Sequence, residues 1–246
     1  MRALFLADAH LCKPEDPNYR VLLTFLEEQC GRTDLLVLLG DIFEFWVGKE
    51  TPLAVYVPLI DALERMGRQG TRLVCVEGNH DFHLGPVFTE RLQARVLPDG
   101  GSIELDGRSV YLAHGDLADP ADHGYRRLRR VLRSALMRGL IRSLPNRLLI
   151  AIATRASNAS RKQSTEQRRT GPVREILWTY AQAILAAGHA AVITGHFHCP
   201  FHEKQDDGEL IALGDWITQF SYAVYENGHF TLNRYQPPAS AGGAHS

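Results

Sequence analysis

The chain has 246 residues, of which 45% are hydrophobic and 22% charged, and its formal net charge is −1. This composition is typical of a globular protein with a sizeable core, and it excludes a disordered or fibrous chain. Its longest apolar runs, such as residues 35–39, are too short to span a bilayer, so an integral membrane protein is excluded as well.

The first half of the chain alternates short apolar runs with helical patterns. The runs cover residues 3–7, 35–39 and 73–76, and the helical patterns lie near residues 20–29 and 54–69. Such alternation predicts an α/β fold with parallel strands. The short N-terminal run is also too brief for a secretory signal, so we expect a cytoplasmic protein.

Later elements are predicted by turn signals and by periodicity. Asp106-Gly107 joins two strands in an expected hairpin, and Asn227-Gly228 joins another pair. Further elements are a helix near residues 173–187 and strands near residues 103–105, 109–113, 191–194, 210–213, 222–225 and 230–235. A Pro/Ala/Gly/Ser tail at residues 237–246 is expected to be disordered.

A strongly basic segment interrupts this pattern. Residues 123–170 contain 13 Lys and Arg against one Glu, so they carry +12 while the rest of the chain carries −13. A helical apolar face is expected from Leu128, Val131, Leu132, Ala135, Leu136 and Leu140, with Arg126, Arg127, Arg130, Arg133 and Arg138 on the other faces. The helices, with a second one starting near Pro145, are either ordinary amphipathic helices or a basic cap for an anionic membrane or lipid.

Polar clusters follow the predicted strands. They are Asp8-Ala9-His10, Gly40-Asp41, Gly78-Asn79-His80-Asp81, His114-Gly115-Asp116 and Gly195-His196-Phe197-His198. Ligands in α/β sheets bind beyond the carboxyl ends of strands, so these clusters are expected to converge. Their ligand set is Asp8, His10, Asp41, Asn79, His114, His196 and His198.

This ligand set is too large for one ion, and it fits two that share a bridging carboxylate. The absence of thiolates favours manganese, iron or zinc in mixed N/O coordination. Two such cations can activate a water molecule and clamp the oxygens of a phosphoryl group during displacement.

The order of the motifs resembles the calcineurin-like metallophosphoesterase superfamily, with its D-x-H, G-D, G-N-H-D, H and G-H-x-H motifs. The resemblance implies a sandwich of two mixed β-sheets flanked by helices. It predicts one domain over residues 1–236, with a helical cap inserted at about residues 122–170. It assigns one metal to Asp8, His10, Asp41 and His198, and the other to Asp41, Asn79, His114 and His196.

Within the superfamily, several segments look like the UDP-2,3-diacylglucosamine pyrophosphohydrolase family of lipid A biosynthesis. They are residues 6–11, 39–46, 78–82, 114–116, 122–125 and 213–216. The resemblance implies hydrolysis of UDP-2,3-diacylglucosamine to UMP and 2,3-diacylglucosamine 1-phosphate, on the cytoplasmic face of the inner membrane. That family usually has arginine where this chain has His80.

The same resemblance implies roles for residues besides the metal ligands. His80 is expected beside the leaving oxygen or the phosphate, and Asp81 is expected to orient it. Substrate contacts are implied for Asn79, His80, Asp122, Tyr125, Ser160, Lys162 and His196. The implied partners are a lipid-linked nucleotide and, through the arginine-rich cap, an anionic membrane surface.

Two alternatives remain open at this point. A related phosphodiesterase or phosphatase with another substrate would have the same metal loops. A nucleic-acid-binding module is disfavoured, because the basic segment lacks the interleaved aromatic residues of a single-strand binder.

Overall fold

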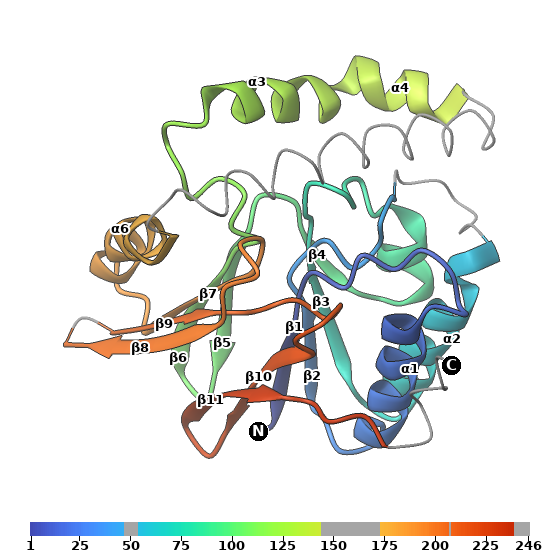
Figure 1. The fold of residues 1–246 in the computed structure, drawn as a ribbon, viewed down its shortest axis with the longest axis horizontal. Helices are drawn as coiled ribbons and strands as arrows, with labels where there is room; N and C mark the ends of the chain where they lie inside the picture. Colours follow the sequence, from blue (N-terminus) through green and yellow to red (C-terminus); the bar gives the residue numbers. More distant parts are fainter. Residues whose placement is uncertain (47–53, 144–172, 207, 239–246) are drawn as a thin grey trace, which may run out of the picture.

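A computed structural model describes residues 1–46, 54–143, 173–206 and 208–238. Two mixed β-sheets pack face to face, with helices on both outer sides (Figure 1). The sandwich of two mixed sheets that the family resemblance implies is therefore confirmed.

The first sheet contains six strands in the order β11-β10-β1-β2-β3-β4. Strands β1 to β4 are parallel, whereas β10 and β11 form an antiparallel hairpin against β1. Their bounds are β1 Ala3–Leu6, β2 Leu35–Leu38, β3 Arg72–Val76, β4 Arg95–Leu97, β10 Ser221–Glu226 and β11 His229–Arg234. Strand β4 was not expected from the sequence.

The second sheet has the order β5-β6-β7-β9-β8. The strands are β5 Gly101–Leu105, β6 Arg108–Leu112, β7 Ala191–Thr194, β8 Phe201–Gln205 and β9 Gly208–Ala212. The hairpin predicted at Asp106-Gly107 joins β5 to β6. Strand β8 was missed because its sequence, FHEKQ, is polar and lies at the edge of the sheet.

Helices cover the outer faces of the sandwich. Helices α1 (Pro17–Gln29) and α2 (Val57–Arg68), with the short η1 (Ala54–Tyr56) and η2 (Val87–Arg91), lie beside the first sheet, and α6 (Val173–Ala186) lies beside the second. Both faces of β1 are buried, and because side chains alternate along a strand, each face packs against a different layer. Leu4 and Leu6 pack toward α1 and α2, whereas Ala3 and Phe5 pack between the sheets.

Helices α3 (His123–Leu132) and α4 (Ala135–Ser143) lie across the end of the sandwich toward which β1, β2 and β3 point (Figure 1). Within the described residues, no helix is both long and apolar enough to cross a membrane. The expected helix after Pro145 and the tail from residue 239 lie outside the described residues.

The apolar face expected for the basic segment is only partly directed inward. Leu132 packs with Phe82, but Leu128, Val131, Leu136 and Leu140 are exposed, Leu136 to 86%. Arg126, Arg129 and Arg133 instead face the sandwich and bond to it. Carboxylates and carbonyls of the sandwich attract these guanidinium groups, which periodicity alone does not reveal.

Candidate metal centre

The loops after β1, β2, β3, β6 and β7 carry the predicted ligands, and they meet at one end of the two sheets. Several of these ligands have left-handed backbone conformations, which are uncommon for residues other than glycine. They are Asp8 (φ 55°), His10 (φ 44°), Asp41 (φ 52°), His196 (φ 70°) and His198 (φ 50°). Strained backbone of this kind collects at functional sites, where the surrounding structure holds it in place.

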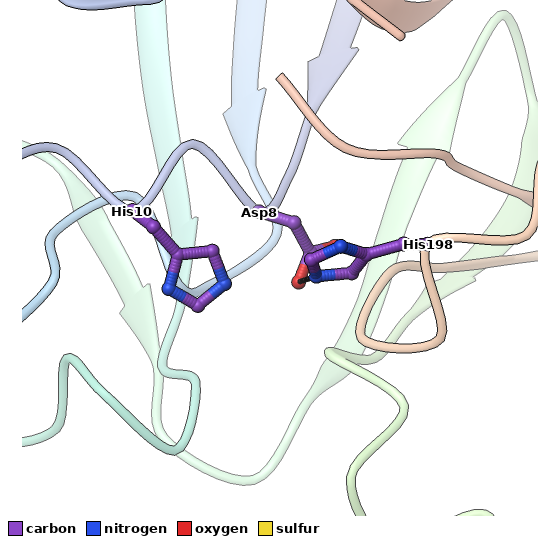
Figure 2. A group of neighbouring side chains, drawn as sticks. All are labelled: Asp8, His10 and His198. Carbon is purple, nitrogen blue, oxygen red and sulfur yellow. Dashed lines mark ion pairs between the residues drawn. The ribbon is translucent and has the colours of Figure 1, made fainter. Parts of the chain in front are cut away.

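The first group of ligand atoms comes from two parts of the sequence that lie far apart. Asp8 and His10 follow β1, and His198 lies between β7 and β8 (Figure 2). His198 Nε2 lies 3.3 Å from Asp8 Oδ1. His10 Nε2 lies 3.8 Å from Asp41 Oδ2, so Asp41 adjoins this group.

The second group surrounds the buried ring of His114. Its Nε2 lies 3.4 Å from Asp41 Oδ2, 3.1 Å from Asn79 Oδ1 and 3.2 Å from His196 Nδ1. Ligands bonded to one cation at about 2.1 Å are separated by roughly 3.0–3.4 Å, so these spacings fit a shared ion. Asp41 Oδ2 adjoins both groups, as expected of a bridging carboxylate.

The charge and burial of these ligands also fit a site that binds cations. Asp8 and Asp41 are almost fully buried, and Asp8 Oδ1 faces the ring of His198, whose Nε2 atom lies 3.3 Å away. Burying carboxylates is costly unless donors or positive charge lie nearby, and a cation between these ligands would supply that charge. The donor set contains oxygen and imidazole nitrogen without sulfur, which is suited to manganese, iron or zinc.

The electrostatics of the imidazoles differ across the second group. Burial raises the pKa of Asp41, but His114 and the other imidazoles outweigh it and hold that pKa well below its usual range. Burial and the neighbouring His114 lower the pKa of His196 to about 4. Burial lowers the pKa of His114, but the charge of Asp41 outweighs it and holds that pKa well above its ordinary value, so the two neighbouring rings differ in their electrostatics.

Outer partners orient three of the four histidines in the ligand set. His10 Nδ1 lies 3.4 Å from Glu44 Oε2, His114 Nδ1 lies 2.8 Å from the Leu39 carbonyl, and His198 Nδ1 lies 3.6 Å from Asp215 Oδ2. Such contacts leave Nε2 of each ring for a metal and fix the ring orientation. Glu44 and Asp215 lie within the segments 39–46 and 213–216 that carry the family resemblance, but the sequence pattern indicates no role for either.

The contact expected between Asp81 and His80 is replaced by another one. His80 Nδ1 bonds the Glu44 carbonyl at 3.0 Å, whereas Asp81 accepts hydrogen bonds from the backbone amides of Asp41, Ile42 and Gly78. The side chain of Asp81 turns toward the loop after β2, because several backbone amides converge there and need an acceptor. Asp81 therefore fastens two ligand loops together rather than orienting His80.

His80 itself borders the first group. Its ring packs edge-on against that of His10, with the centroids 4.8 Å apart. Burial lowers the pKa of His80, but the charge of Asp41 and the bond to Glu44 raise it above its ordinary value overall.

The two described cap residues with expected substrate contacts have structural partners. Asp122 Oδ1 accepts a hydrogen bond from the Tyr125 amide at 2.9 Å and so caps the N-terminus of α3. The Tyr125 hydroxyl donates to Asp116, which lies just after His114. Ser160 and Lys162 lie outside the described residues.

Comparisons with known proteins agree with this arrangement. Residues 1–200 match the calcineurin-like phosphoesterase family. The chain is 34% identical to the UDP-2,3-diacylglucosamine hydrolase of Aeromonas salmonicida, over 100% of this chain and 98% of that protein. It is 36% identical to the enzyme of the same name from Pseudomonas paraeruginosa, over 93% of this chain and 97% of that protein.

A solved archaeal phosphodiesterase has a similar fold, with a TM-score of 0.50 at 15% identity, over 96% of this chain and 100% of that one. Members of the family depend on two metal ions, and the clusters described above are candidates for holding them. The match over most of the chain, together with the converging ligand loops, shows that the chain belongs to the calcineurin-like phosphoesterase family.

Proposed function

We propose that this protein is a two-metal hydrolase that cleaves the pyrophosphate of UDP-2,3-diacylglucosamine. Its products would be UMP and 2,3-diacylglucosamine 1-phosphate. The observation that supports this most directly is the similarity to UDP-2,3-diacylglucosamine hydrolases over essentially the whole chain. The grouping of carboxylates and imidazoles supplies the chemistry that such a reaction requires.

In this proposal, Asp8, His10, Asp41 and His198 hold one cation, and Asp41, Asn79, His114 and His196 hold the other. When bound, a pair of divalent cations lowers the pKa of a water molecule and stabilises negative charge on phosphoryl oxygens. The buried loops position the ligands before substrate arrives, so little reorganisation is needed during the reaction. We propose Mn²⁺ as the cation, with iron or zinc as alternatives, since all three suit mixed oxygen and imidazole ligands.

His80 would act on the phosphate rather than on a metal. Its Nδ1 is held by the Glu44 carbonyl, which leaves the Nε2 side of the ring available to a phosphate oxygen. Asn79 and His196, which adjoin His114, would contact the same phosphate, and the cap residues Asp122, Tyr125, Ser160 and Lys162 would contact the rest of the substrate.

The bond that breaks is predicted to join the α-phosphorus to the bridging oxygen. Detergent-solubilised UDP-2,3-diacylglucosamine should therefore yield UMP only when Mn²⁺ is supplied to the metal-stripped protein. In H₂¹⁸O the label should enter UMP and be absent from the lipid phosphate. Label in the lipid phosphate would place the attack at the other phosphorus.

Ligand variants test the site itself. His114→Ala should lower turnover by more than about 100-fold, because loss of a direct ligand exceeds the effect of losing an outer partner. His229→Ala, an exposed histidine on β11, is the matched control and should remain active. If soluble p-nitrophenyl phosphate esters turn over while the lipid nucleotide does not, the protein is a phosphoesterase with another substrate.

We further propose that the protein binds the cytoplasmic face of the inner membrane through α3 and α4. Leu128, Val131, Leu136 and Leu140 are exposed there, and Arg127 and Arg130 are exposed beside them on α3. Exposed apolar and cationic side chains on one helix favour an anionic lipid surface. Sedimentation with vesicles should increase with the fraction of anionic lipid and fall for Leu136→Asp, and binding that ignores both would contradict this proposal.

A further inference from the structure

Two buried carboxylates beside the metal loops have no place in the ligand set. Glu77 is 4% exposed and precedes the loop that carries Asn79, and Asp116 is 8% exposed and follows His114 by two residues. A buried carboxylate is strongly destabilising unless a cation or several donors satisfy it. The residues that pair with Glu77 and Asp116 therefore affect the stability of the metal-ligand loops beside them.

Both carboxylates pair with arginines of the same helix. Arg133 Nη1 lies 2.8 Å from Glu77 Oε2, and Arg129 Nε lies 3.0 Å from Asp116 Oδ2. The two arginines are four residues apart, Arg129 in the last turn of α3 and Arg133 as its C-cap residue, so they lie on one side of the helix end. Each side chain is only 13% exposed.

Each guanidinium also bonds the backbone next to these loops. Arg133 donates to the Gly78 carbonyl at 3.3 Å and to the Pro98 carbonyl at 2.7 Å. Arg129 donates to the same Pro98 carbonyl at 3.2 Å. A planar guanidinium can serve several acceptors at once, whereas the single ammonium group of lysine cannot reproduce that geometry.

We propose that Arg129 and Arg133 are positioning residues that fix the Asn79 loop relative to the His114 loop. These ligands come from different sheets, and their contact atoms lie 3.1 Å apart. Helix α3 spans the two loops and holds each through one arginine. This inference rests on the proposed function only in assuming that Asn79 and His114 share a cation.

The first test is metal binding, measured by calorimetric titration of Mn²⁺ into metal-stripped protein. Arg133→Met and Arg129→Met should each weaken Mn²⁺ binding about 10–100-fold, the range found for outer partners of metal ligands. Arg20→Met is the control, since Arg20 is exposed on α1, away from the metal loops, and has no ion pair among the described residues. Equal Mn²⁺ affinity in Arg133→Met, Arg129→Met and the control would overturn the proposal.

A second variant separates positioning from simple charge neutralisation. Arg133→Met removes the ion-pair partner of the buried Glu77 and leaves it the Leu84 amide as a donor, which destabilises the fold by itself. The double variant Glu77→Gln/Arg133→Met removes both charges and should melt at a higher temperature than Arg133→Met. It should still bind Mn²⁺ weakly, because the bonds to Gly78 and Pro98 remain absent; wild-type affinity in the double variant would overturn the proposal.

Kinetics give an independent readout on a soluble phosphate ester. Arg133→Met should need about 10–100-fold more Mn²⁺ for half-maximal turnover, with the KM for the ester unchanged. A raised KM for the ester with an unchanged Mn²⁺ requirement would contradict metal-loop positioning. If the wild type binds Mn²⁺ but leaves the lipid nucleotide intact, the proposed substrate fails, while the Mn²⁺ titrations still decide this inference.

Discussion

Gly40 is a point at which three ligand loops come together, and Gly40→Ala tests whether that close approach holds the site together. Its φ is +86°, and a Cβ built there would lie 2.7 Å from His114 Nδ1 and 2.8 Å from the Gly78 Cα. The left-handed conformation costs a non-glycine residue about 1–2 kcal/mol. Forcing a methyl group against packed backbone adds roughly 1–3 kcal/mol.

The sum is about 2–5 kcal/mol, and in a domain of this size each kcal/mol lowers the melting temperature by about 2–4 °C. Gly40→Ala should therefore melt roughly 10 °C below the wild type in differential scanning fluorimetry of metal-stripped protein. Gly107→Ala is the matched control, because Gly107 has φ +79° with nothing within 4 Å of its built Cβ. Only the conformational cost applies there, so a loss of about 4 °C is expected.

The second part of the experiment measures how Mn²⁺ changes the melting temperature of each variant. Mn²⁺ should raise the melting temperature of the wild type and of Gly107→Ala equally, because it binds the folded state. It should raise that of Gly40→Ala by less, because the methyl group displaces His114. If both alanine variants melt together and respond equally to Mn²⁺, the close approach at Gly40 has no part in stability or binding.

Two further predictions concern carboxylates. Asp215→Asn should weaken Mn²⁺ binding about 10–100-fold in calorimetry by loosening the partner of His198, whereas the surface variant Asp61→Asn should bind normally. Glu209 is buried and pairs with Arg108 at 3.0 Å; burial raises the pKa of Glu209, but Arg108 and its other partners outweigh it and lower that pKa below its ordinary value. The pair therefore stabilises the fold above the unfolded-state pKa of about 4.5 and loses that effect as the pH falls through the lower folded-state pKa. The melting temperature of Glu209→Gln should lie below that of the wild type at pH 7 and approach it in acid; a gap that persists in acid would contradict this assignment.

The sequence predicted the position of the ligand loops because chemistry and topology agree there. Asp8 and Asp41 follow apolar runs that form parallel strands, and the carboxyl ends of parallel strands meet at one edge. It could not predict the outer partners, because Glu44 and Asp215 reach their histidines only through the folded loops. The left-handed conformation of Asp8 likewise depends on loop contacts that no short pattern contains.

The orientation of α3 is a second feature that the sequence pattern does not predict. Helical spacing grouped Leu128 with Val131 on one apolar face but left open whether that face packs on the protein or meets a lipid, and both residues are exposed. Which face turns inward depends on distant acceptors, and here Glu77 and Asp116 draw the arginine face toward the sandwich. The charged face of an amphipathic helix can thus be the one that packs on the protein, when buried carboxylates pair with its arginines.

The bond from the His196 amide to Asp8 Oδ2 joins residues separated by 188 positions, and β10, near the end of the chain, pairs with β1. During synthesis the ribosome must release the chain through the loop after β7 before Asp8 can meet His196. Loops closed over such distances form late and slow the folding of a domain. A nascent chain stopped before β7 could pair β1 with β2 but would leave its other edge without β10, and it would lack two of the imidazoles of the metal centre.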